Sequence, residues 1–211
     1  MNEVFENNTA LGTINSFVSK NRKFLLITLV TILLIVLVFI SINFLKNVNN
    51  EKAGIIYSDF ISQDISTEEG RLISEKLLTE LLNSYKKTGY TKIAVINKAS
   101  FYAQDSQIDE AIKYFEILRD LTSGLSGDKL LNKIANVNLA RIYYSIKDYE
   151  KALEMLEKYD SSSSGMVYEI TGDILSKQDK PDLAKAQYFL AKDLYTDEVS
   201  IDIVTMKIAN L

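Results

Sequence analysis

The sequence predicts an all-α protein with a single transmembrane helix near its N-terminus, followed by a solenoid of helical hairpins. Three observations support this fold class. An uninterrupted apolar run occupies residues 24–45, the 211 residues include only one Pro and eight Gly, and one spacing of small residues recurs three times after the run. Few Pro and Gly favour long helices over a sandwich of short strands.

The apolar run reads FLLITLVTILLIVLVFISINFL, in which 18 of 22 residues are Leu, Ile, Val or Phe and none is charged. At about 1.5 Å per residue, such a helix covers roughly 33 Å, enough to cross a hydrocarbon core about 30 Å thick. A buried core helix of a soluble protein would rarely be apolar on all sides over this length. The run also exceeds the roughly 7–15 residues of a signal-peptide core and ends without a small-residue cleavage site. We therefore expect an uncleaved anchor at residues 24–45.

The basic residues around the run predict its orientation. Three of them crowd its N-terminal side and two are spread along its C-terminal side: Lys20, Arg22 and Lys23, then Lys46 and Lys52. Because positive residues stay in the cytoplasm, we expect residues 1–23 to be a cytoplasmic tail and residues 46–211 to lie outside. Within the tail, the spacing of Leu11, Ile14, Phe17 and Val18 allows a short amphipathic turn on the membrane surface, or else a disordered tail.

The composition of residues 46–211 excludes several functions. The tail carries three basic and two acidic residues, so this part keeps 21 of the 24 basic and 26 of the 28 acidic side chains, a net charge of −5. A nucleic-acid footprint needs a basic face instead. The absence of Cys and His removes thiol nucleophiles, zinc clusters and the commonest general base. We expect no cofactor, no metal site and no catalytic residues.

Weak chemical motifs occur but lack their partners. Residues 126–129 (SGDK) and 84–87 (SYKK) match S-x-x-K, the motif of serine acyl-transferases, without the accompanying S-D-N or K-T-G elements. The acidic pairs Asp59 with Asp64 and Glu68 with Glu69 are interpreted as solvated loop charges, and the serines of residues 161–164 as a loop or helix cap. An enzyme using Ser or carboxylate chemistry in these loops is the alternative from a different functional class.

Residues 51–90 predict a first, atypical helical pair. Ala53, Ile56, Tyr57 and Phe60 mark one apolar face, a polar break follows at residues 63–67, and a Leu-rich second helix ends near Gly89. We expect this pair to cap the stack on its membrane side.

After this pair, one spacing recurs three times. A small residue is followed twelve positions later by Ala in the pairs Ala99 and Ala111, Ala140 and Ala152, Gly172 and Ala184. Large residues lie three positions after the first and four after the second member: Tyr102 and Phe115, Tyr143 and Leu156, Leu175 and Tyr188. Small residues let two antiparallel helices approach closely while the large ones fill the space beside the contact.

Residues typical of turns and helix starts lie at equivalent positions between the two helices of each segment. Residues 106–109 (SQID) provide a capping-box-like start, Asp148 a helix cap, and Pro181 the first residue of a helix. The whole pattern resembles the degenerate tetratricopeptide signature, in which two helices form each repeat of about 34 residues. It departs from that signature because Trp and the closing Pro are absent and the Ala-to-Ala steps are 41 and 32 residues. The longer step contains a loop at residues 122–128.

Several stretches are similar to the bacterial ancillary subunit of the SecYEG translocon: residues 84–90 (SYKKTGY), residues 168–174 (YEITGDI) with Ala184, Tyr188 and Ala191, and the ending 206–211 (MKIANL). The resemblance extends over most of residues 20–211. It implies a single-pass bacterial inner-membrane protein with a periplasmic tetratricopeptide-like domain. It also implies two partners, the SecYEG translocon and a membrane-anchored periplasmic chaperone resembling prolyl isomerases.

The first helices of tetratricopeptide hairpins line a concave groove, which is a typical partner surface. The alignment of the segments places six residues there: Gln104, Arg141, Tyr144, Glu169, Asp173 and Lys177. Arg and Tyr are enriched among residues that dominate interface energetics, although an ordinary charged helix face has the same composition. The main hypothesis is thus a non-enzymatic scaffold of the Sec translocon that links it to periplasmic chaperones for exported proteins. A scaffold for cell-envelope assembly or division is the alternative.

Overall fold

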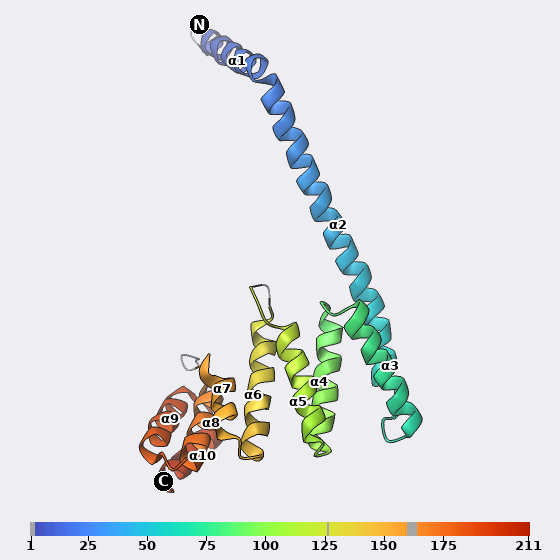
Figure 1. Cartoon of the computed structure of the whole chain (residues 1–211). Helices are drawn as coiled ribbons and strands as arrows, with labels where there is room; N and C mark the ends of the chain where they lie inside the picture. Colours follow the sequence, from blue (N-terminus) through green and yellow to red (C-terminus); the bar gives the residue numbers. More distant parts are fainter. Residues whose placement is uncertain (1–2, 126, 160–163) are drawn as a thin grey trace. The chain divides into compact units, whose positions relative to one another are not determined.

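The computed structural model describes residues 3–125, 127–159 and 164–211. Over these residues the chain is 83% helical and has no strand, which confirms the predicted all-α class. The helices are α1 (Glu3–Lys20), α2 (Arg22–Ile61), α3 (Glu68–Ser84), α4 (Gly89–Gln104), α5 (Ile108–Leu121), α6 (Lys129–Ser145), α7 (Tyr149–Glu157), α8 (Gly165–Lys177), α9 (Pro181–Leu194) and α10 (Glu198–Ala209) (Figure 1).

The chain divides into two units, Met1–Lys52 and Ala53–Leu211. The first unit contains α1, which gives the tail a helix where a disordered segment was one expectation, and the greater part of α2. In the described residues, α2 is the one helix long and apolar enough to cross a membrane, by length and composition, and none of its most apolar window is buried. A core helix of a soluble protein would be buried, whereas the side chains of this window are exposed.

Polar side chains within the apolar run bond to the helix itself. The hydroxyls of Thr28, Thr31 and Ser41 donate to the carbonyl oxygens four residues earlier, at 3.0, 2.9 and 2.8 Å. An unsatisfied polar group in hydrocarbon costs several kcal/mol. These three hydroxyls therefore add little to the cost of placing the run in a bilayer.

The second unit is a stack of antiparallel helices. Helices α4 and α5, α6 and α7, and α8 and α9 form three hairpins, and α10 packs on α9 (Figure 1). The repeated small residues lie at the centre of these hairpins, because Ala99, Ala111, Ala140, Ala152 and Ala184 are all fully buried. This burial confirms the helical pairing predicted from the spacing.

The first helices of the hairpins form one continuous face of the stack. Helix α6 contacts both α4 and α8. This arrangement gives the stack a shared surface made of first helices, as the solenoid hypothesis requires.

The three hairpin turns share a backbone conformation that was not predicted. Ser106, Lys147 and Asp179, each seven residues after the small residue of its first helix, have φ angles of 59°, 66° and 57°. In each turn the next residue donates its N–H to a carbonyl five residues earlier, at 2.9, 2.9 and 3.0 Å. This is the Schellman helix ending, in which a left-handed residue reverses the chain. A non-glycine residue in that conformation costs about 1–2 kcal/mol, which the hydrogen bonds and hairpin packing offset.

The predicted helix starts are correct in two of three hairpins. Asp148 accepts a hydrogen bond from the Lys151 N–H at 3.2 Å, and Pro181 opens α9. At α5 the residue before the helix is Gln107, with no side-chain cap, so the capping-box expectation at residues 106–109 is wrong. Ser106 serves instead as the left-handed residue of the preceding turn.

The first pair consists of the last turns of α2 and the whole of α3. Tyr57 joins α2 to α4: its ring centroid lies 5.7 Å from that of Tyr90, and its hydroxyl accepts from the Asn97 amide at 3.2 Å. The second helix was expected to end near Gly89, but α3 stops earlier, at Ser84. Gly89 instead begins α4. Thr88 caps that new helix by accepting from the Thr91 N–H at 3.3 Å.

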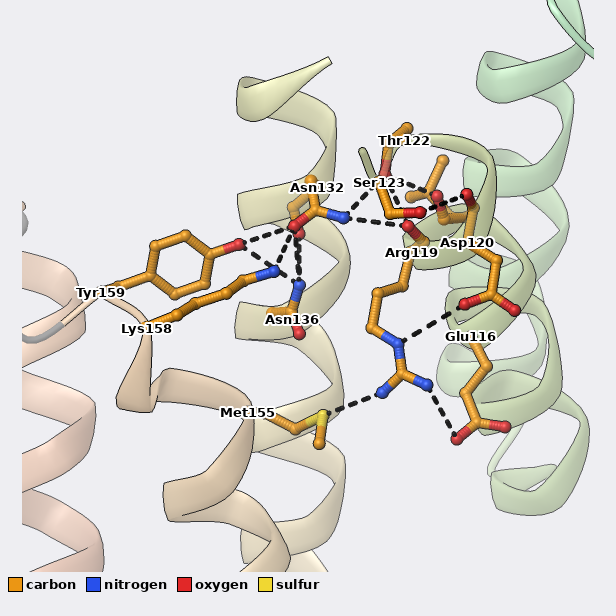
Figure 2. Close-up of polar contacts among 11 residues, drawn as sticks. Glu116, Arg119, Asp120, Thr122, Ser123, Asn132, Asn136, Met155, Lys158 and Tyr159 are labelled. Atoms are coloured by element: carbon orange, nitrogen blue, oxygen red, sulfur yellow. Dashed lines mark hydrogen bonds and ion pairs between the residues drawn. The ribbon is translucent and has the colours of Figure 1, made fainter. Parts of the chain in front are cut away.

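A buried amide holds the insertion between the first two hairpins. Asn132 of α6 donates to the Arg119 carbonyl oxygen at 2.9 Å and to the Thr122 hydroxyl at 3.1 Å, which ties α6 to the end of α5. Its carbonyl oxygen accepts from Lys158 and, at 3.0 Å, from the Tyr159 hydroxyl, both just after α7 (Figure 2). One side chain thus links α6 to the C-terminal ends of α5 and α7, beside the loop at residues 122–128 that lengthens this repeat.

Gly172 offers a direct test of the close contact between α8 and α9. A Cβ atom at Gly172 would lie 2.5 Å from Cε1 of Tyr188, whose ring is buried. We expect Gly172→Ala to lower the free energy of unfolding by about 1–2 kcal/mol, because displacement of the ring outweighs the gain of about 1 kcal/mol in helix propensity. Chemical denaturation of the full chain measures the change.

Gly89→Ala is the matched control, because a Cβ atom there meets nothing within 4 Å. This variant should be as stable as the unsubstituted chain or slightly more so. Equal effects of the two substitutions would mean that α8 and α9 do not approach as closely as described.

Candidate partner-binding surface

A cleft opens on the face formed by the first helices, near the C-terminal end of the stack. Its volume is about 210 Å³, and it is bordered by Tyr144 of α6, Asp173 and Lys177 of α8, Tyr188 of α9 and Lys207 of α10. Four helices therefore contribute to one concave site.

Of the six residues predicted to line a groove, Tyr144, Asp173 and Lys177 border this cleft. Glu169 lies one helical turn before Asp173 and shares the Lys207 ammonium with it. Arg141 is exposed, and its guanidinium Nη2 lies 3.2 Å from the Met166 sulfur of α8.

Gln104 is exposed at the end of α4 and is not among the residues bordering the cleft. The structure thus brings the predicted residues of α6 and α8 together and leaves the one from α4 apart from them.

Lys207 of the last helix is the centre of the site, and the sequence analysis did not identify it. Its ammonium lies 2.7 Å from a carboxylate oxygen of Glu169 and 2.7 Å from one of Asp173. The second oxygen of each carboxylate accepts from a tyrosine hydroxyl: Tyr195 at 2.5 Å for Glu169 and Tyr188 at 2.8 Å for Asp173. This network fastens α9 and α10 to the groove face of α8.

The network shifts the titration of its members. Partial burial alone would raise the pKa of Glu169, but the hydrogen bonds from Lys207 and Tyr195 outweigh it and hold that pKa below its usual value of 4.5. Burial and the neighbouring carboxylates raise the pKa of the Tyr188 and Tyr195 hydroxyls, which stay protonated as donors. Burial, followed by the charge of Asp173, also raises the pKa of Tyr144.

The two carboxylates predicted to face a partner are therefore occupied within the protein. Their side chains are 20% and 26% exposed, and a cation lies against both. Arg141 and Lys177, in contrast, are exposed, and Tyr144 is half-buried beside them. The exposed surface that remains combines two cations with an aromatic ring, and its charge is complementary to acidic groups.

A signal for Lys207 is present in the sequence. It is the single basic residue of α10, a helix whose other residues are mostly apolar. Such a cation has to meet water or a carboxylate, yet the spacing gives no indication that its partners lie 34 and 38 residues earlier.

Two acidic residues of the weak chemical motifs, Asp64 and Asp128, have structural roles. The Asp64 carboxylate accepts from the Ser66 N–H at 3.0 Å and the Ser66 hydroxyl at 2.6 Å, and these bonds lower the pKa of Asp64. Asp128 caps α6 by accepting from the Leu131 N–H at 3.1 Å. Ser126 and residues 161–163 lie outside the described residues.

The hairpins, the turns and the shared face agree with the comparison to known families. The sequence matches the tetratricopeptide repeat-like domain family over residues 15–211. The chain belongs to this family. Tetratricopeptide repeat-like domains are typically non-catalytic scaffolds for protein interactions. A comparison with curated proteins gives no match.

The Lys207 network predicts how stability depends on pH. Because the pKa of folded Glu169 lies below 4.5, the unfolded chain binds more protons than the folded chain just below pH 4.5, so stability falls as the pH drops through this range. We expect Glu169→Gln to cost about 1–2 kcal/mol at pH 6 and to make the further loss between pH 6 and pH 3.5 smaller than in the unsubstituted chain. Urea denaturation at the two pH values measures both effects.

Glu80→Gln on the exposed surface of α3 serves as the control and should leave both values unchanged. If Glu169→Gln kept the full acid-induced loss, the carboxylate would not be stabilised by Lys207.

Proposed function

We propose that this protein is a non-enzymatic, membrane-anchored scaffold whose repeat domain binds other proteins. One observation carries the proposal: a tetratricopeptide repeat-like domain belongs to the same chain as an unburied helix that is long and apolar enough to span a bilayer. In this proposal residues 24–45 lie in the membrane, residues 1–23 in the cytoplasm and residues 46–211 on the opposite side.

Anchoring this protein in the membrane would let a weak contact suffice for binding a partner in the same membrane. Two proteins confined to one membrane surface meet at a high effective concentration, so an interface of modest affinity stays occupied. Lys177 is exposed and borders the cleft with Tyr144, and the exposed Arg141 precedes Tyr144 by three residues on α6. These side chains provide such an interface.

The partners we propose are the SecYEG translocon and a membrane-anchored periplasmic chaperone resembling prolyl isomerases, in the bacterial inner membrane. The support is the similarity of residues 84–90, 168–174 and 206–211 to the ancillary subunit of that translocon. The last two stretches contain Glu169, Asp173 and Lys207, so the resemblance is strongest where the site lies. The protein would then link the translocon to chaperones for exported proteins.

Orientation is tested with reporter fusions placed after Leu211 of the full chain. The basic cluster before the span predicts that a reporter active only in the periplasm is active and that a cytoplasmic reporter is inactive. The reverse pair of activities would invert the topology and remove periplasmic chaperones from the possible partners.

Docking is tested by reversing two charges at the groove. We expect Arg141→Glu with Lys177→Glu to leave the helical content unchanged, because both side chains are exposed, and to lower recovery of the cross-linked partner from membranes. A loss of about 2 kcal/mol at an interface corresponds to roughly thirtyfold in affinity. Cross-linking in intact membranes, followed by mass spectrometry, gives both the identity and the yield of the partner.

Lys76→Glu with Lys185→Glu is the control, since it changes the net charge equally at exposed sites on α3 and α9, two helices that carry none of the predicted groove residues. If the groove variant recovered its partner at the control's yield, docking would lie elsewhere. Recovery of envelope-assembly or division proteins in place of the translocon would replace the proposed partner and retain the scaffold.

A further inference from the structure

A second cleft lies in the repeat domain, apart from the groove site. It has a volume of about 210 Å³ and is formed by the end of α2, the α2–α3 loop, α3 and α4. Its walls include the apolar side chains of Phe60, Ile61, Ile65 and Phe101. For comparison, an apolar cavity of about 150 Å³ admits benzene, so this cleft has room for an aromatic side chain.

Ser74 of α3 borders this cleft and lacks a hydrogen-bond partner. The residue is 1% exposed, and its hydroxyl is the one buried side-chain polar atom without a partner in the described part of the chain. A helical hydroxyl ordinarily donates to the carbonyl four residues earlier, as Thr79 of the same helix does at 2.8 Å. Leaving a buried hydroxyl unpaired costs about 1–3 kcal/mol, so a ligand that satisfies it would recover that cost.

Lys98 of α4 borders the same cleft and is 5% exposed. Its ammonium lies 3.0 Å from a carboxylate oxygen of Glu75 and 5.1 Å from the Tyr102 ring centroid. The other Glu75 oxygen accepts from the Tyr114 hydroxyl at 2.5 Å. The cation is thus paired and fixed in place.

The charge balance selects the kind of ligand. Because Glu75 neutralises Lys98, the cleft does not call for an anion. The group in the cleft that lacks a partner is the Ser74 hydroxyl, which lies beside an apolar surface and could donate to a neutral hydrogen-bond acceptor. A peptide carbonyl next to a large apolar side chain supplies both groups.

We propose that this cleft binds an aromatic residue of a partner polypeptide, with the ring against Phe60 and Phe101 and a peptide carbonyl oxygen accepting from Ser74. The side-chain amides of Gln63 and Asn97 also border the cleft. Their nitrogens donate to the Asp59 carbonyl oxygen at 2.8 Å and to the Tyr57 hydroxyl at 3.2 Å, so Ser74 provides the unpaired donor of the site. This site is independent of the groove at Tyr144 and would let the domain hold a second, unfolded or extended segment.

The probe for this site is N-acetyltryptophanamide, which carries an indole ring and two neutral carbonyl groups. The chain has no Trp, so excitation of the indole beyond the absorption band of the 12 tyrosines reads the probe alone. The full chain is reconstituted in liposomes, and bound probe is measured by equilibrium dialysis against protein-free liposomes. We expect saturable binding, weakened about fivefold by Ser74→Ala, the change typical of one lost hydrogen bond.

Stability separates this effect from misfolding. Ser74→Ala removes an unpaired buried hydroxyl, so the variant should be at least as stable as the unsubstituted chain. Ser84→Ala, at an exposed position of the same helix, should leave probe affinity unchanged. Ser74→Ile should abolish binding by filling the cleft.

A second ligand tests the role of the carbonyl. The compound 3-methylindole keeps the ring and lacks the carbonyl, so its affinity should be the same for the unsubstituted chain and for Ser74→Ala. The proposal is overturned if the amide probe does not saturate, if Ser74→Ala and Ser84→Ala bind it alike, or if the two ligands respond equally to Ser74→Ala.

Discussion

The repeat domain depends on the close approach of paired helices at positions where the side chain is small. Ala140 and Ala152 are fully buried between α6 and α7, and Gly172 lies directly against the Tyr188 ring between α8 and α9. Close-packed interiors tolerate little change in volume. The small residues therefore set the distance between the helices of each hairpin, and the large residues beside them, Leu156 and Tyr188 among them, can fill the remaining space only at that distance.

The same constraint determines what the groove can present. Tyr188 is positioned by Gly172, and its hydroxyl then reaches the Asp173 carboxylate at 2.8 Å. Lys207 completes the site by meeting both acidic residues of α8. Two of the predicted partner residues thereby become part of the structure that holds the last helix. In the proposed function, recognition is left to the exposed residues Arg141 and Lys177 and to Tyr144.

The sequence predicts the hairpins well because their spacing is a local property. A small residue followed by Ala twelve positions later needs no knowledge of distant contacts, and Pro181 marks its helix start by its own chemistry. The left-handed helix endings were not predicted, because backbone hydrogen bonds stabilise them. The residues at these positions, Lys147 and Ser106 among them, are not types that mark such an ending.

The interactions over long sequence separations could not be derived from the sequence in the same way. Lys207 meets carboxylates 34 and 38 residues away, and Asn132 bonds to Lys158 and Tyr159, 26 and 27 residues later. Such contacts depend on which helix faces lie against each other, which periodicity alone does not specify. The unpaired hydroxyl of Ser74 is the extreme case, because it is defined by the absence of a neighbour.

The clefts near Tyr144 and near Ser74 differ in chemistry, and this difference bears on how a scaffold of weak sites can be selective. Near Tyr144 the exposed cations Arg141 and Lys177 favour a polar, acidic segment. Near Ser74 the charges cancel, and an apolar wall with one unmet hydroxyl favours a neutral, aromatic one. In the proposed function, a partner that carried both kinds of segment at the right separation would gain by linkage, since joining two weak sites raises affinity by about 10²–10⁴ without any new contact. A partner with one segment alone would stay weakly bound, so discrimination would come from the pair of sites more than from either site alone.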